Sequence, residues 1–263
     1  MVTDRPARKG RGGRSHRSIV VITTWASCTY ALLLAPDPLL LHDPIPPSYA
    51  ATATATGTTT ASSICSGSAS ILFCGKSWPR DTTQLQCYQR AGLGADVKAL
   101  DLSPLACLTL LRDLSLVSGE IEFIQALKLG SLAPLSGLHA LQQLSLEETD
   151  VTDVRPLAGL KQLRRLSLHH SQVIDVQPLH SLDAMEDLDL SCTRIADLRP
   201  LRALKRLQRI DLTGTPIDDL SPLKDLPQLR WLGLREDKPA LREQAQALRK
   251  DRPDLLISVG RAY

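Results

Sequence analysis

Aromatic residues are the scarcest class in this 263-residue chain, where phenylalanine, tryptophan and tyrosine together make up 3%. The hydrophobic fraction is nevertheless 43%, so a folded core must be built from aliphatic side chains, mainly leucine. The chain also lacks a glycine-rich phosphate loop, a G-x-S-x-G motif and an H-E-x-x-H motif. We therefore expect a protein that is not an enzyme, with no catalytic residues and no cofactor.

Net charge is also scarce once the amino-terminal segment is set aside. The formal net charge is +3, yet residues 1–17 hold six bases and a single acid, Asp4. The six bases are Arg5, Arg8, Lys9, Arg11, Arg14 and Arg17. Residues 18–263 therefore carry a net charge of −2, which argues against nucleic-acid binding, because that affinity comes from neutralising phosphates.

Residues 1–35 have the layout of an export signal, a basic stretch followed by an uncharged and largely apolar one. Residues 24–28 resemble the bacterial lipobox, in which small residues precede a cysteine that becomes lipidated. This resemblance implies lipidation of Cys28. Three alternatives stay open: a cleaved lipoprotein signal, an uncleaved signal anchor, and a disordered leader or mis-assigned start. The first two predict export and a membrane contact through this segment alone.

Residues 36–64 have the composition of a disordered linker. Five prolines fall within 36–49, and residues 50–63 are almost entirely alanine, threonine, glycine and serine. Such segments bury too little apolar surface to offset the entropy of the chain. We expect them to tether a folded domain to the amino-terminal segment.

The six cysteines show neither C-x-x-C spacing nor nearby clusters of histidine, which argues against a zinc site or any other metal site. Cys65, Cys74 and Cys87 lie close together in residues 65–96, the expected amino-terminal cap. In an exported protein one disulfide among these three, most simply Cys74–Cys87, would staple the cap. Buried free thiols are the alternative.

A 22-residue repeat begins at residue 138. Each unit opens with a leucine and contains a segment such as Leu144-x-Leu146, or Ile210-x-Leu212 in one unit, and each full unit closes on Asp-x-x-Pro-Leu. The opening leucines are Leu138, Leu160, Leu182, Leu204 and Leu226, and the closing aspartates are Asp153, Asp175, Asp197 and Asp219. An earlier unit spans 30 residues from Leu108 and carries an apolar insertion at 121–132, which either packs on the convex side or offers a second contact surface.

The period of two in Leu-x-Leu predicts a short strand with both leucines on one face. One such strand cannot bury its leucines, so the copies must stack into a continuous parallel sheet over a leucine core. The proline of each unit suits a 3₁₀ turn, and the aspartate can accept a backbone N–H that starts the turn. We read these aspartates as structural rather than as a calcium ladder, and the Thr/Ser column at 149, 171, 193 and 215 as bonding nearby backbone groups.

The repeats resemble the 22-residue leucine-rich repeats of bacterial internalins and of the leucine-rich regulatory subunit of protein phosphatase 1. The resemblance covers residues 97–236. It implies an α/β leucine-rich-repeat solenoid, with a short parallel sheet on the concave face and turns or 3₁₀ segments on the convex face. It also implies a protein that binds other proteins.

An open solenoid must close its ends, and residues 237–263 are the expected carboxy-terminal cap. Asp237 can start a helix over 239–250 that places Leu241, Ala245 and Leu248 on one face. Pro253 ends this helix. Residues 255–257 can then add a last strand.

The outward residues of the strands form the expected partner-binding surface. We predict contacts at Arg165, His169, Asp187, Asp189, Arg209, Asp211, Trp231 and Arg235. The three aspartates should attract a cation unless the neighbouring arginines neutralise them. Trp231 is either an interface anchor or packed against the carboxy-terminal cap.

The combined expectation is a monomeric, non-enzymatic scaffold at the cell envelope that binds a protein partner through its concave face. A cytosolic regulatory or effector protein with the same solenoid is the first alternative. A hydrolase that uses Asp187, Asp189 and Asp211 is the second, and it requires a divalent metal near Asp189.

Overall fold

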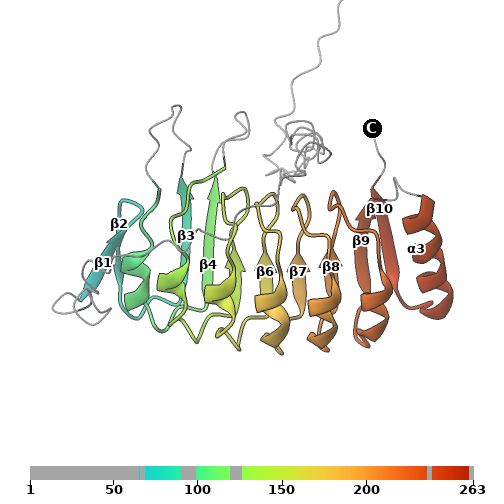
Figure 1. Ribbon diagram of the computed structural model, residues 1–263. Helices are drawn as coiled ribbons and strands as arrows, with labels where there is room; N and C mark the ends of the chain where they lie inside the picture. The colour runs from blue at the N-terminus through green and yellow to red at the C-terminus, as the bar shows by residue number, and fades with distance from the viewer. Residues whose placement is uncertain (1–64, 66–68, 90–98, 119–125, 236–238, 261–263) are drawn as a thin grey trace, which may run out of the picture.

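The computed structural model describes residue 65 and residues 69–89, 99–118, 126–235 and 239–260. Its eight-stranded parallel sheet runs in chain order from β3 to β10, and the strands lie side by side with a row of 3₁₀ turns (Figure 1). The expectations for Cys28, the signal-like segment and the linker fall outside the described residues. No helix within the described ranges is long and apolar enough to cross a membrane.

The strands of the sheet follow the spacing of the repeats. They are β3 (Gln84–Gln89), β4 (Asp113–Ser118), β5 (Gln143–Ser145), β6 (Arg165–Ser167), β7 (Asp187–Asp189), β8 (Arg209–Asp211), β9 (Trp231–Arg235) and β10 (Leu256–Gly260). Leu144, Leu166 and Leu188 are register partners on β5, β6 and β7, and at most 2% of each is exposed. The predicted parallel sheet over a leucine core is confirmed.

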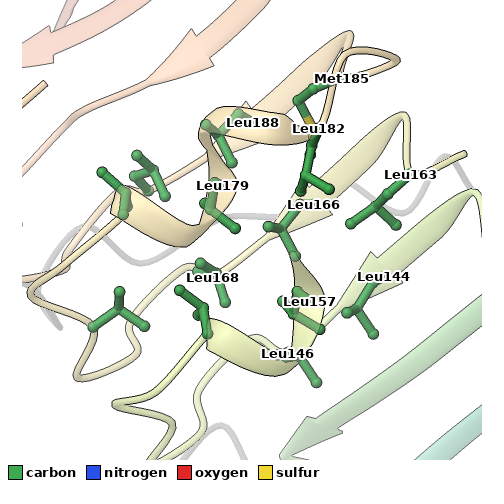
Figure 2. Close-up of a cluster of buried hydrophobic side chains, with 14 of the residues drawn as sticks. Leu144, Leu146, Leu157, Leu163, Leu166, Leu168, Leu179, Leu182, Met185 and Leu188 are labelled. Carbon is green, nitrogen blue, oxygen red and sulfur yellow. The ribbon is translucent and has the colours of Figure 1, made fainter. Parts of the chain in front are cut away.

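The 3₁₀ turns close each unit on the side opposite the strands. They are η2 (Ser103–Cys107), η3 (Ala133–Leu135), η4 (Arg155–Leu157), η5 (Gln177–Ser181), η6 (Arg199–Ala203) and η7 (Ser221–Asp225). Each has a proline in its first two positions, where a missing backbone N–H removes no helical bond. Their leucines, Leu157 and Leu179 among them, fill the space behind the strands (Figure 2).

The repeated aspartates start these turns, as predicted. Asp153 Oδ1 accepts the Arg155 backbone N–H at 2.9 Å, and Asp197 Oδ1 accepts that of Arg199 at 2.9 Å. Asp175 and Asp219 do the same, at 2.7 and 2.8 Å, for the residues two positions later.

The Thr/Ser column follows its prediction at three of four positions. The hydroxyls of Thr149, Thr193 and Thr215 donate to backbone oxygens three residues earlier, at 2.6 to 2.8 Å. The hydroxyl of Ser171 is buried without a hydrogen-bond partner, so there the prediction is wrong. Serine lacks the methyl group that restricts the χ1 angle of threonine, so it can turn its hydroxyl away from the carbonyl.

Two disulfides hold the amino-terminal end. One joins Cys74 to Cys87, which ties the hairpin of β1 (Ser70–Phe73) and β2 (Lys76–Pro79) to β3. The other joins Cys65 to Cys107 in η2, a pairing that the sequence analysis did not consider. Strand β3 lies within the segment expected as a cap, and it pairs with β4 as the first strand of the parallel sheet.

The later part of the insertion joins the core. Leu127 and Leu129 are each 5% exposed, and they form isolated parallel bridges to Thr149 and Leu100. The Asp150 carboxylate accepts the Leu129 backbone N–H at 2.7 Å. These two leucines therefore pack inward rather than offering a contact surface. Residues 119–125 of the insertion lie outside the described ranges.

The carboxy-terminal end is closed by helix α3 (Pro239–Asp251) and strand β10. Leu241, Ala245 and Leu248 of α3 are buried, as predicted, and β10 pairs in parallel with β9. The Arg252 guanidinium donates to the backbone oxygens of Leu226 and Leu229, at 3.0 and 2.8 Å, and so fastens the cap to the last repeat. Asp237, the expected helix start, lies outside the described residues.

Candidate functional site

The concave face of the sheet carries a groove of about 690 Å³ that extends from Trp78 in β2 to Asp211 in β8. Its floor consists of the residues that alternate with the buried leucines, because successive side chains of a strand point to opposite faces. Five carboxylates and two guanidinium groups line it, giving a net charge of −3. They are Asp113, Glu147, Asp187, Asp189 and Asp211, with Arg165 and Arg209.

The register brings most of the predicted residues together. Arg165, Asp187, Arg209 and Trp231 are partners on the four adjacent strands β6 to β9. Asp189 and Asp211 are partners on β7 and β8. His169 and Arg235 lie farther along the chain from their strands' first residues, so they border this cluster rather than form its centre.

Arg209 and Trp231 form the best-defined contact of the surface. The guanidinium carbon of Arg209 lies 3.9 Å from the centre of the Trp231 ring, within cation–π distance. Arg209 Nε lies 3.8 Å from Asp187 Oδ1. Burial nevertheless raises the pKa of Asp187, and the nearby carboxylates of Asp189 and Asp211 raise it further, while Arg209 and Arg165 lower it. Burial is therefore the reason that the pKa of Asp187 is raised, because the two arginines together outweigh the two neighbouring carboxylates.

Arg165 is directed away from the aspartates. Its guanidinium donates to the Gln143 side-chain oxygen at 3.2 Å. The Asp113 carboxylate also contacts a glutamine, because its Oδ2 accepts the Gln84 side-chain amide at 2.7 Å. These two contacts leave Arg209 as the cation that pairs with the aspartate cluster among the described ion pairs.

Asp189 takes part in a hydrogen-bonded chain that leads to His169. Asp189 Oδ1 accepts the backbone N–H of Ser191 at 2.9 Å and its hydroxyl at 2.5 Å. The Ser191 oxygen lies 2.7 Å from His169 Nδ1. Because the serine proton goes to the aspartate, we assign the proton of this second bond to His169 Nδ1. The order is then carboxylate, serine, imidazole, whereas a nucleophilic serine needs the imidazole as its base and the carboxylate behind it.

The neighbouring histidine does not join this chain. His170 occupies the left-handed backbone position (φ 56°) at which the chain leaves the sheet, and the two imidazole centres are 5.9 Å apart. Among the residues that the structure describes, no group of three or more His, Cys, Asp or Glu is arranged to hold a metal ion. The metal-dependent hydrolase has no supporting observation here.

Gly233 explains how Asp211 and Trp231 come together. A Cβ atom at this position would lie 2.4 Å from Asp211 Oδ1 and 2.7 Å from Trp231 Cη2. The missing side chain thus lets the carboxylate and the tip of the indole converge over the backbone of β9. The register partner of Trp231 on β10 is Leu256, whose exposed fraction is 68%.

The amino-terminal wall of the groove was not predicted from the sequence. Trp78 of β2, together with Gln84 and Gln86 of β3, lines this end. Leu85-x-Cys87 has the same period of two as Leu-x-Leu and pairs in register with Leu114-x-Leu116. That spacing was the available signal, although cysteine in place of the second leucine and the altered distance to the next unit obscured it.

The comparison with family models agrees with the repeat. Residues 183–225 match the family described as Leucine Rich repeats (2 copies). No curated protein matches the chain. Among solved structures, internalin C2 of Listeria monocytogenes is 23% identical over 71% of this chain and 86% of its own, with a TM-score of 0.46. An internalin (inlF) of the same organism is 17% identical over 72% of this chain and 66% of its own, with a TM-score of 0.41. The repeats of this chain are leucine-rich repeats, and its fold is a leucine-rich-repeat solenoid.

Proposed function

We propose that this protein is a non-enzymatic scaffold whose concave groove binds a protein partner. The observation that carries the proposal is the arrangement of charged and aromatic side chains on that face. Asp187, Asp189 and Asp211 lie side by side on β7 and β8, and a half-buried tryptophan lies on the next strand. Among the described ion pairs, Arg209 is the cation that contacts this cluster. Tryptophan and arginine are among the residue types that contribute most of the binding energy at protein interfaces.

The contact residues that we propose are Arg165, His169, Asp187, Asp189, Arg209, Asp211, Trp231 and Arg235. Trp231 and Arg209 are stacked in the free protein, so they lose little side-chain entropy when a partner covers them. The serine–histidine order around Asp189 supports a binding role over a nucleophilic one.

Charge reversal tests this proposal. Asp189→Arg combined with Asp211→Arg should abolish partner capture from native cells, as measured by quantitative mass spectrometry against the unaltered protein. The matched control is Asp183→Arg with Glu243→Arg, which makes the same change in net charge at exposed positions outside the groove. Equal capture by all three proteins would place the binding surface elsewhere.

We further propose that the solenoid is exported and tethered at the cell envelope, with lipidation at Cys28 and residues 36–64 as the linker. The support is the basic-then-apolar layout of residues 1–35 and the composition of the linker. Intact mass and membrane fractionation of the full chain test it. A species that begins at Cys28 with added acyl mass is the expected result, and an unprocessed soluble chain would favour the cytosolic regulatory protein instead.

A further inference from the structure

The concave groove is more acidic than the rest of the protein. Its lining carries a net charge of −3, whereas residues 18–263 as a whole carry −2. A surface of one sign recruits and orients a partner segment of the opposite sign. The charge therefore gives information about the partner that the fold does not.

Two of the groove's carboxylates, Asp189 and Asp211, are register partners on adjacent strands. Each uses Oδ1 for the backbone N–H two residues later, Ser191 at 2.9 Å and Thr213 at 3.0 Å. Within the part of the chain that the structure describes, neither carboxylate makes an ion pair, because Arg209 contacts Asp187 and Arg165 contacts Gln143. Two neighbouring carboxylates thus face the groove without a cation.

An aromatic surface adjoins these carboxylates. Gly233 lets the Trp231 ring lie against the Asp211 carboxylate, and the ring already accepts the guanidinium of Arg209 at 3.9 Å. This contact within the protein shows that the Trp231 ring can bind a guanidinium group. Leu256, 68% exposed on the adjacent strand, offers an apolar contact for the methylene groups of a long basic side chain.

We propose that Asp189, Asp211 and Trp231 form a subsite for the basic side chains of the partner, so that the occupant of the groove is a cationic polypeptide segment. Arginine fits better than lysine, because its planar guanidinium both stacks on an indole and pairs with carboxylates. This inference rests on the proposed partner binding by the concave face, and it specifies the chemical class of the partner.

The test uses the full chain with three capped peptides as probes: hexa-arginine, hexa-lysine and hexa-glutamate. Isothermal titration at low salt should give the order hexa-arginine, then hexa-lysine, with no binding of hexa-glutamate. Because the two carboxylates are partly exposed to solvent, the affinity should fall as salt shortens the screening length. Equal binding of the acidic peptide would overturn the proposal.

Matched variants localise the binding. Asp189→Asn with Asp211→Asn keeps the acceptor oxygens for the loop N–H groups but removes both charges, and it should weaken hexa-arginine binding about tenfold. Asp183→Asn with Glu243→Gln removes the same charge outside the groove and should leave the affinity within about twofold. An equal loss in both variants would mean that the peptide senses only net charge, which would overturn the subsite.

Gly233→Ala provides a second variant that changes no charge. Its Cβ forces the Asp211 carboxylate and the tip of the indole apart, so hexa-arginine binding should weaken several-fold while the unfolding transition monitored by circular dichroism stays intact. Unchanged affinity would overturn the role of the paired carboxylate and ring.

The outcome separates this inference from the proposed function. Loss of partner capture in the charge-reversal variant, together with hexa-arginine binding that is insensitive to Asp189→Asn with Asp211→Asn, would leave the concave face as the binding surface and overturn the cationic partner. An uncharged polypeptide or a glycan would then be the occupant.

Discussion

The aspartates of the convex turns and those of the concave sheet differ in what surrounds them, although their exposure is similar. The side chain of Asp197 is 49% exposed and that of Asp187 is 43% exposed. Asp197 accepts the backbone N–H of Arg199 and a bidentate pair from its guanidinium, at 2.8 to 3.0 Å, which lowers its pKa to about 2. Asp187 lies in the hollow of the sheet, where burial raises its pKa. Exposed area alone therefore does not distinguish a structural carboxylate from a binding one. The hydrogen-bond donors around each carboxylate make that distinction.

The largest expected effect compares three charges on each face. Asp153→Asn, Asp197→Asn and Asp219→Asn together should lower the midpoint of thermal unfolding by roughly 5 °C, because each carboxylate is held by charge-assisted donors. Asp187→Asn, Asp189→Asn and Asp211→Asn together should leave the midpoint unchanged or slightly raised. Thermal unfolding of both triple variants is followed by circular dichroism. Equal decreases in the midpoint would show that the two sets of aspartates contribute equally to stability.

Acid should remove the stabilisation that the aspartates of the convex turns provide. Donors from Arg155 hold the pKa of Asp153 below its usual value, and donors from Ser221 do so for Asp219, while Asp197 is held at about 2. Because the folded-state pKa is the lower one, the stabilisation is complete above about pH 4 and is lost as the pH falls toward 2. Urea unfolding between pH 2 and 6 should show this loss in the unaltered protein and a shallower one in the convex triple variant. Parallel curves would contradict the assignment.

The Thr/Ser column allows a comparison of two buried hydroxyls, with smaller expected effects on stability. Thr193→Ala breaks a 2.6 Å hydrogen bond to the Leu190 oxygen inside the protein, so it should cost about 1 kcal/mol in the free energy of unfolding. Ser171→Ala removes a buried hydroxyl without a partner, so it should be neutral or stabilising by a few tenths of a kcal/mol. Chemical denaturation measures both, and a comparable cost at Ser171 would mean that its hydroxyl is bonded in solution.

The smallest effect concerns Asp187 alone. Its pKa is raised, so its charge opposes folding at neutral pH, and Asp187→Asn should raise the stability slightly, by about 0.5 kcal/mol or less. The difference should close as acid protonates Asp187 in the unaltered protein. A loss of stability at pH 7 would show that the contact with Arg209 outweighs the burial of the charge.

The sequence predicted the regular part of this protein well, because each repeat must satisfy the same local rules. The spacing of Leu166 and Leu188 fixed which residues face the core, and the aspartate before each proline fixed how the turns begin. The same alternation predicted that Asp189, Arg209, Asp211 and Trp231 face outward, and the register pairs Asp189 with Asp211 and Arg209 with Trp231.

The irregular parts could not be predicted in this way. Cys65 and Cys107 are 42 residues apart, and their pairing depends on how the amino-terminal end folds back onto η2. Strand β3 belongs to the sheet although its unit departs from the repeat length. Leu127 and Leu129 of the insertion find the core only through bridges to neighbouring units.

By itself, the sequence determined the period of the repeats and which side chains of the strands from β5 to β9 face the concave surface, because a repeat of constant length leaves one register open to each unit. The tertiary structure alone decided which charges are paired. Arg209 contacts Asp187 and the Trp231 ring, and Arg165 donates to Gln143. The missing side chain at Gly233 lets Asp211 lie against the indole. Long side chains reach several neighbours on adjacent strands, so their partners follow from distances between strands, which no spacing along the chain contains.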